Sequence, residues 1–263
     1  MAIAILVCLP ASSALAYDFD RTLSRGARGR DVRALEIRVA GWYPRAAKRR
    51  LHVNRRFGRR TTRAVKAYQR HYGLAVDGIA GPQTFRSLRR LQDRDGSTAH
   101  FRWSEFEQHR NASCSRRANS YAGGFRGGRV GPTRVKRNVR RVMWRLEAVR
   151  AKGRSRPIEI VSGFRSVAYN RCISGATRSQ HLYGTGVDVR MLRASASRLR
   201  RLARRSQIHG IECYASASHS HFDLRIENRA LRGERYWWWP ERDRYGRELS
   251  SDGSVCRGEK KRR

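Results

Sequence analysis

The stretch SQHLYGTGVDV, residues 179–189, places a histidine and an aspartate seven residues apart with two glycines between them. Gly184 and Gly186 allow the chain to turn sharply after His181. From Gly186 onward apolar and polar residues alternate, which predicts a strand whose polar face carries Asp188. A sharp turn and a strand in this order bring His181 and Asp188 to one side of a small sheet.

Other segments of the second half complete this sheet and its helices. PIEIV leads into SGFRS, and HFDLRI alternates with His221 and Asp223 on its polar face. Strand patterns cover residues 157–161, 186–191 and 221–226, and helical patterns cover residues 135–149 and 195–205. The predicted fold class is therefore α+β, with a small antiparallel sheet.

His181, Asp188 and His221 form a candidate metal site on this sheet. Two imidazoles and a carboxylate suit zinc, and three protein ligands leave a fourth position for water, as in catalytic zinc sites. Histidines scattered along a sequence are more often surface or core residues, so the spacing alone leaves that alternative open.

The first half contains a short internal repeat. Val53–Thr61 is repeated 23 residues later as Val76–Thr84, with glycine at the same place in both copies. Glycine at a helix cap and Pro82 at a first helical position predict a loop that enters a helix in each copy. With an earlier helix opened by Asp31, residues 20–91 are predicted to be a small three-helix domain, and the polar residues 92–100 a linker.

The net charge and the N-terminal segment restrict the expected partner and the cellular location of the protein. Lys+Arg number 59 against 21 Asp+Glu, a net charge of +38, so an anionic partner is expected. Residues 1–16 carry no charge and end in Ala-Leu-Ala, which predicts a secretory signal peptide. We therefore expect a secreted, periplasmic or wall-associated protein without a membrane span, with no nucleic acid as its partner.

The cysteines agree with export. Without Cys8, which lies in the predicted signal peptide, four cysteines remain: Cys114, Cys172, Cys213 and Cys256. An even number in an exported chain predicts two disulfides, and three pairings are possible. We favour Cys114 with Cys172 and Cys213 with Cys256.

The first unit resembles a known binding domain. LSRGARGRDVRALEIRV followed by FGRRTTRAVKAYQRHYGLAVDGIAGPQTF is similar to the peptidoglycan-binding domain attached to many wall hydrolases. The resemblance implies that peptidoglycan is a partner of residues 20–91. A helical module that docks only on its own catalytic domain is the alternative.

The second unit, residues 101–256 before a basic tail at 257–263, resembles the secreted zinc D-Ala-D-Ala carboxypeptidases. The resemblance rests on SGFRSVAYN, SQHLYGTGVDV and a later His-x-His. It implies one zinc per chain on His181, Asp188 and His221. It also implies that Arg165 binds the terminal carboxylate of the substrate, a role suited to a bidentate guanidinium.

This sequence departs from the family at the general base. Where the fullest family pattern has an acidic residue and a histidine, this chain has Ser218 and Ser216. His219 is retained as a candidate oxyanion donor or base, and Asp223 and Glu212 are further candidates for the proton transfer.

Three functions are compatible with these observations. The first is a zinc peptidase, either a D-alanyl-D-alanine carboxypeptidase or a murein D,D-endopeptidase, acting on stem peptides as a monomer. The second is a catalytically impaired wall-binding protein that keeps the fold and the metal site. The third is a basic exported factor that binds anionic envelope polymers through its charge.

Overall fold

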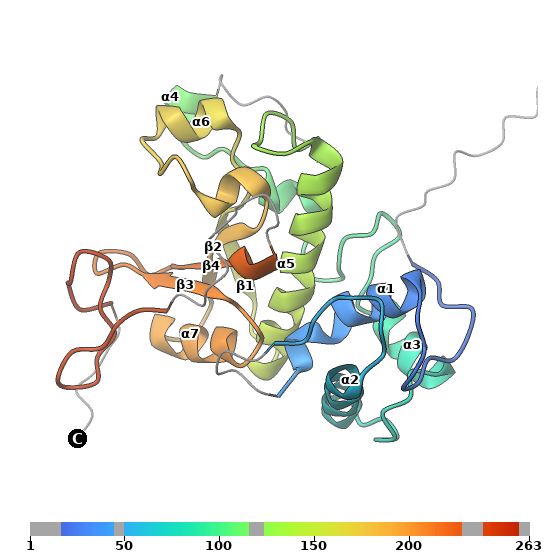
Figure 1. The fold of residues 1–263 in the computed structure, drawn as a ribbon. Coiled ribbons are helices and arrows are strands. Elements are labelled where there is room, and N and C mark those ends of the chain that lie inside the picture. The colour runs from blue at the N-terminus through green and yellow to red at the C-terminus, as the bar shows by residue number, and fades with distance from the viewer. Residues whose placement is uncertain (1–16, 45–49, 116–123, 228–238, 258–263) are drawn as a thin grey trace, which may run out of the picture.

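The computed structural model describes residues 17–44, 50–115, 124–227 and 239–257. The helices α1 to α3 gather on one side of the long helix α5, and a sheet with the remaining helices lies on its other side (Figure 1). Residues 1–16, in which the signal peptide is predicted, and all of the predicted tail except Arg257 lie outside the described residues.

The N-terminal helices begin where the sequence predicts. Each copy of the internal repeat leads into a helix, with Gly58 and Gly81 as the N-caps, and Pro82 occupies a first helical position. Backbone hydrogen bonds join the loops between the helices, as between Leu23 and Ala80. The elements are α1 (Arg30–Val39), a 3₁₀ turn η1 (Ala40–Trp42), α2 (Arg59–His71) and α3 (Pro82–Arg89).

The second part of the chain is an α+β unit, as predicted. Its four-stranded sheet is antiparallel throughout, in the order β1-β2-β4-β3. The strands are β1 (Ile158–Ser162), β2 (Gly186–Met191), β3 (Gly210–Cys213) and β4 (Ser220–Asp223). The helices are η2 (Trp103–Phe106), α4 (Ala112–Ser115), α5 (Pro132–Lys152), α6 (Val167–Cys172), η3 (Gln180–Tyr183), α7 (Ala196–Arg204) and η4 (Arg225–Glu227).

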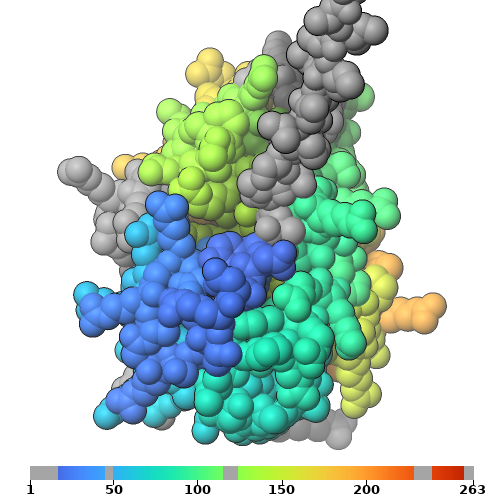
Figure 2. All heavy atoms as spheres, turned by 90° about the vertical axis from the view of Figure 1, so that its right-hand side faces the viewer, coloured from blue at the N-terminus to red at the C-terminus, as the bar shows by residue number. Residues whose placement is uncertain are grey.

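Helix α5 belongs to two hydrophobic cores. Val135, Val139, Val142 and Met143 pack with the inner face of the sheet, whereas Trp144 and Ala148 belong to the core of the N-terminal helices. In Figure 2 the atoms of the N-terminal helices (blue to teal) lie against those of α5 (lime green). The predicted linker also contacts this helix, because His100 pairs with Glu147 at 2.9 Å.

The last strand is shorter than the sequence pattern predicts. The alternation was expected to hold a strand from residue 221 to 226, but β4 ends at Asp223. The backbone N–H of Arg225 donates to the Asp223 carboxylate at 2.8 Å, which turns the chain into η4. Strand β3 was not predicted at all, since four residues are too few for a pattern of alternation.

Two disulfides fasten the segments around the sheet. Cys114 is bonded to Cys172, which joins α4 to α6, and Cys213 is bonded to Cys256, which joins β3 to the C-terminal segment. This is the pairing that we favour from the sequence. Among the described residues there is no helix with the length and apolar character needed to cross a membrane.

Candidate active site

Strand register brings the candidate ligands together. Asp188 on β2 pairs with His221 on β4, and His221 pairs in turn with Glu212 on β3. On the other side of Asp188 the partner is Ser162 of β1. Directly paired residues of antiparallel strands point to the same face, so these four side chains form one row across the sheet.

His181 reaches this row from the short helix η3. The Ser179 hydroxyl caps this turn, and Gly184 ends it with a left-handed backbone at φ 68°. A Cβ at Gly186 would lie 2.9 Å from the backbone nitrogen of His181, so only glycine allows this close approach. The two glycines noted in the sequence therefore position His181 above Asp188.

The three candidate ligands converge on one point. His181 Nε2 lies 3.1 Å from His221 Nδ1 and 3.3 Å from Asp188 Oδ1, and His221 Nδ1 lies 2.9 Å from Asp188 Oδ1. Ligands arranged tetrahedrally around zinc at about 2.0–2.1 Å are separated by about 3.3 Å. The side chains therefore have the spacing of a zinc site.

Neighbouring acceptors fix the tautomers of both histidines. His181 Nδ1 donates to the Gly163 carbonyl at 2.5 Å, which leaves the Nε2 lone pair for a metal. His221 Nε2 faces Asp223 Oδ2 at 3.4 Å, which leaves Nδ1 for the same point. Two ring nitrogens and a carboxylate oxygen directed at one position are a donor set that suits zinc.

The electrostatics of the buried cluster favour an ionised carboxylate. Burial alone would raise the pKa of Asp188, but His181 and His221 hold it well below its usual range. Burial lowers the pKa of His221, whereas its hydrogen bonds to Asp188 and Asp223 raise it to about 9. The cluster therefore holds an anion at the point where the three side chains meet, which suits a metal cation.

Arg165 lies next to the ligands and already holds one of them. Its Nη2 donates to Asp188 Oδ2 at 2.8 Å, and its Nε donates to the Ser162 hydroxyl at 3.0 Å. Its Nη1 has no hydrogen-bond partner among the residues that the structure describes. One donor nitrogen of the guanidinium therefore stays available for a substrate carboxylate.

Asp223 lies behind His221. Its side chain is fully buried, and Arg225 holds its carboxylate through Nε and Nη2. Burial would raise the pKa of Asp223, but the hydrogen bonds from His221 and Arg225 lower it far below the usual range. Such a group remains an anion and orients the His221 ring, a geometry better suited to positioning than to proton transfer.

The loop between β3 and β4 carries the remaining candidates. His219 is half-buried with its ring 5.0 Å from that of Tyr214, and burial lowers its pKa. Ser216 and Ser218 are exposed. None of these three residues lines the hollow in front of the metal ligands.

That hollow has a volume of about 510 Å³, and its charged lining includes two arginines that the sequence analysis did not identify. Arg178 and Arg225 line it together with Arg165, His181 and His221. Glu212 is the carboxylate in this lining, and Tyr214 stands beside it. The pairing of Glu212 with His221 depends on β3, so only the structure reveals it.

The chain is similar to two family profiles and to curated relatives. Residues 112–223 match the profile of the peptidase M15 family, and residues 28–88 match that of a putative peptidoglycan binding domain. The zinc D-Ala-D-Ala carboxypeptidase of Streptomyces albus G is 38% identical over 194 residues, which span 74% of this chain and 69% of that protein. The N-acetylmuramoyl-L-alanine amidase CwlM of Mycobacterium tuberculosis is 43% identical over 75 residues, or 27% of this chain and 17% of that protein.

Solved structures give local similarity. The N-terminal domain of SleB is 34% identical and covers 27% of this chain and 92% of that one, with a TM-score of 0.24. The L-Ala D-Glu endopeptidase ChiX of Serratia marcescens is 26% identical and covers 41% of this chain and 88% of that one, with a TM-score of 0.21.

Proposed function

Because the chain belongs to the peptidase M15 family, we propose that it is a zinc-dependent peptidase that hydrolyses the stem peptides of peptidoglycan. The observation that carries the proposal is the convergence of His181 Nε2, His221 Nδ1 and Asp188 Oδ1 at the floor of an open hollow. Nothing in the family match indicates impairment. The N-terminal helices match a peptidoglycan-binding domain, so peptidoglycan is the partner of the whole chain.

The proposed ligands of the zinc are His181, Asp188 and His221. A zinc ion held there supplies Lewis acidity toward the scissile carbonyl and the attacking water. The Gly163 carbonyl and Asp223 orient the two imidazoles, and Arg165 orients Asp188. Each ligand is thus supported by a neighbour that fixes its direction.

For the substrate, we propose D-alanyl-D-alanine carboxypeptidase activity. Arg165, Arg178 and Arg225 line the hollow, and guanidinium groups bind a terminal carboxylate in a bidentate manner. A cross-link through a lysine side chain has no free carboxylate next to the scissile bond, whereas a terminal D-alanine always has one. Release of D-alanine from a stem pentapeptide therefore distinguishes the two activities.

For the proton transfer, we propose Glu212 in place of the acid that the family pattern would have at position 218. Glu212 lines the hollow and neighbours His221 across the sheet, whereas Ser218 is exposed outside the hollow. Asp223 is held by Arg225, and His219 does not line the hollow. General acid–base groups contribute about 10²–10⁴-fold to rates.

The test uses zinc-loaded protein and defined muropeptides, with the products identified by mass. We expect the wild type to release D-alanine and His181→Ala to lose its bound zinc. Glu212→Gln should keep its zinc, and its turnover should be lower than that of the wild type by a factor of at least about 10². The matched control is Glu241→Gln, an exposed glutamate away from the hollow. Unchanged turnover in Glu212→Gln together with loss in Asp223→Asn at full zinc content would move the acid–base role to Asp223.

We also propose that residues 1–16 direct export and are removed. A peptidase of peptidoglycan acts in the cell wall, which lies beyond the cytoplasmic membrane, and the segment has the pattern of a signal peptide. N-terminal sequencing of exported protein tests this, with Tyr17 as the expected first residue.

A further inference from the structure

Helix α3 has two faces with different roles. Phe85 and Leu88 are buried in the core of the N-terminal helices. The opposite face carries polar residues at helical spacing i, i+3, i+4 and i+7, namely Gln83, Arg86, Ser87 and Arg90. Gln83, Arg86 and Arg90 are exposed, whereas Ser87 is half-buried and its hydroxyl lies 2.7 Å from that of the buried Tyr68. The Ser87 hydroxyl keeps capacity for a further hydrogen bond, so all four residues can contact a ligand.

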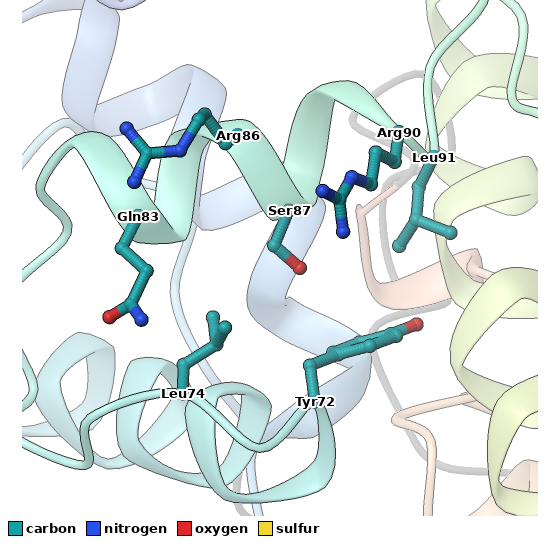
Figure 3. Close-up of a pocket in the computed structure, with 7 residues that line it drawn as sticks. All are labelled: Tyr72, Leu74, Gln83, Arg86, Ser87, Arg90 and Leu91. Carbon is teal, nitrogen blue, oxygen red and sulfur yellow. The ribbon is translucent and has the colours of Figure 1, made fainter.

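This polar face forms one wall of a hollow of about 330 Å³. The other wall is apolar and comes from the end of α2 and the loop after it, with Tyr72 and Leu74, and Leu91 closes one side. In Figure 3 the side chains of Gln83 and Ser87 point toward this wall, and Arg90 stands at the end of the hollow next to Leu91. The hollow thus combines apolar contact area with polar groups on one side.

The two arginines of the hollow have no acidic partner. Neither the Arg86 nor the Arg90 guanidinium makes an ion pair or a side-chain hydrogen bond within the described part of the chain, whereas Arg89 on the same helix lies 3.7 Å from Asp18. An exposed guanidinium without an acidic partner is suited to bind a carboxylate, through two parallel N–H···O bonds. The geometry therefore favours a ligand that carries carboxylate groups.

The aromatic residue of the hollow is already engaged. The ring of Tyr72 lies 4.6 Å from that of Tyr68, 5.5 Å from that of Trp42 and 4.9 Å from that of His71. A sugar ring needs an open aromatic face to stack on, and peptidoglycan sugars bring few charges to the arginines. The stem peptide has free carboxylates and small alanine methyl groups, which suit the arginines and the apolar wall.

We propose that the hollow between α3 and the end of α2 binds the carboxylate-bearing end of a peptidoglycan stem peptide. Arg86 and Arg90 hold carboxylates, Gln83 and Ser87 hydrogen-bond the peptide backbone, and Leu74 and Leu91 contact the alanine methyl groups. The proposal deepens the proposed function and rests on it, since peptidoglycan is taken as the common target of both parts of the chain. The hollow would hold the enzyme on uncross-linked wall, where such ends are abundant.

The test is binding of a synthetic stem tetrapeptide, L-Ala-γ-D-Glu-L-Lys-D-Ala, to the full chain. A carboxypeptidase that removes a terminal D-alanine from the pentapeptide leaves this tetrapeptide intact. Arg86→Ala/Arg90→Ala is compared with Arg59→Ala/Arg63→Ala, a pair of exposed arginines one turn apart on α2, outside the hollow, that removes the same charge. We expect affinity about 10- to 100-fold lower for the first pair and nearly unchanged for the second.

Further probes separate the alternatives. The same tetrapeptide as a C-terminal amide should bind more weakly to the wild type, and chitotetraose should not compete. Equal losses in both arginine pairs mean attraction by bulk charge and overturn the proposal, as does competition by chitotetraose. Binding that is lost in Arg165→Ala and insensitive to Arg86→Ala/Arg90→Ala places the peptide at the metal site alone and also overturns it.

Hydrolysis of the soluble pentapeptide tests the proposed peptidase function independently of peptide binding in the hollow. The variant Arg86→Ala/Arg90→Ala should retain wild-type turnover on it, because the hollow is not part of the metal site. Peptide binding that depends on Arg86 and Arg90 in a chain without peptidase activity contradicts the proposed function and leaves the hollow as a peptide site.

Discussion

Asp223 controls its neighbour without facing the substrate. Its carboxylate is fixed by Arg225 on one side and faces His221 Nε2 on the other, at 3.4 Å. This arrangement keeps the proton of His221 on Nε2, so that Nδ1 is directed at the proposed zinc position. A partner of this kind typically contributes 10–100-fold in metal affinity.

We therefore predict that Asp223→Asn weakens zinc binding by about 10- to 100-fold, because an amide loses the charge that orders the His221 ring. Competition with a chromophoric chelator measures the affinity, and Asp243→Asn, a change in a carboxylate far along the chain that pairs with Arg247, serves as control. Turnover per bound zinc should fall less than affinity does. An unaltered zinc affinity would contradict the positioning role.

Only some of the contacts between these site residues could be predicted from the sequence. His181 and Asp188 were predicted to share one side of the sheet because turn glycines and alternation lie within one short stretch of sequence. Glu212 could be proposed only as a neighbour in sequence, because its place depends on the register of β3 against β4. Likewise, the Arg165–Asp188 contact joins residues 23 positions apart and has no local signal.

At the scale of single elements, α5 is the helix on which both parts of the chain depend. Its Arg145 is almost fully buried and donates to Glu227 of η4 at 2.7 Å and to the Ile37 carbonyl of α1 at 3.2 Å. Arg141, one turn earlier, lies 3.3 Å from the same glutamate. The sequence predicted the apolar stripe of α5 but not these contacts, which join distant segments.

The ion pairs of Glu227 predict a dependence of stability on pH. Burial alone would raise the pKa of Glu227, but Arg145 and Arg141 lower it from 4.5 to about 2. As pH falls below about 4.5 the unfolded chain takes up this proton before the folded one does. The contribution, of the order of 3 kcal/mol, is therefore complete above pH 4.5 and is lost as the pH approaches 2.

Denaturant unfolding of wild type and Glu227→Gln between pH 2 and pH 7 measures this contribution. The variant should be less stable at pH 7, and the difference in unfolding free energy should narrow as the pH falls below 4.5. The variant Glu105→Gln, which changes a glutamate on η2 remote from Arg145, is the control. A difference that stays constant over the whole range would show that Glu227 does not titrate in this way.

At the scale of the whole molecule, we expect the positive net charge and the hollow beside α3 both to contribute to binding of the cell wall. With a net charge of +38, we propose that the basic surface attracts anionic envelope polymers in addition to peptidoglycan. Attraction of this kind is screened by salt, whereas contacts inside a hollow are screened less. Binding of the wild type to purified sacculi should therefore fall with salt to a plateau, and Arg86→Ala/Arg90→Ala should lower that plateau. Loss of all binding at moderate salt would assign it to charge alone.

The two cores share α5, so the chain should unfold as one unit. The side chain of Trp144 is buried among the N-terminal helices, and Lys152 at the end of the same helix donates to the carbonyls of Gly41 and Arg205. Separating the two parts exposes Trp144 and leaves the Gly41 carbonyl without its Lys152 donor, so each part stabilises the other. Scanning calorimetry of the wild type should show a single transition.

Trp144→Ala tests this coupling, because it removes apolar contact from one core and leaves the face of α5 toward the sheet intact. Removing a buried tryptophan side chain costs about 3–5 kcal/mol, and here the loss falls on the N-terminal helices. The variant should therefore show two transitions, the lower one from the N-terminal helices, with zinc still bound after it. Arg137→Ala, an exposed change on the same helix, should keep the single transition. A single transition in Trp144→Ala, shifted as a whole, would mean that the remaining polar contacts of α5 suffice to hold the two parts together.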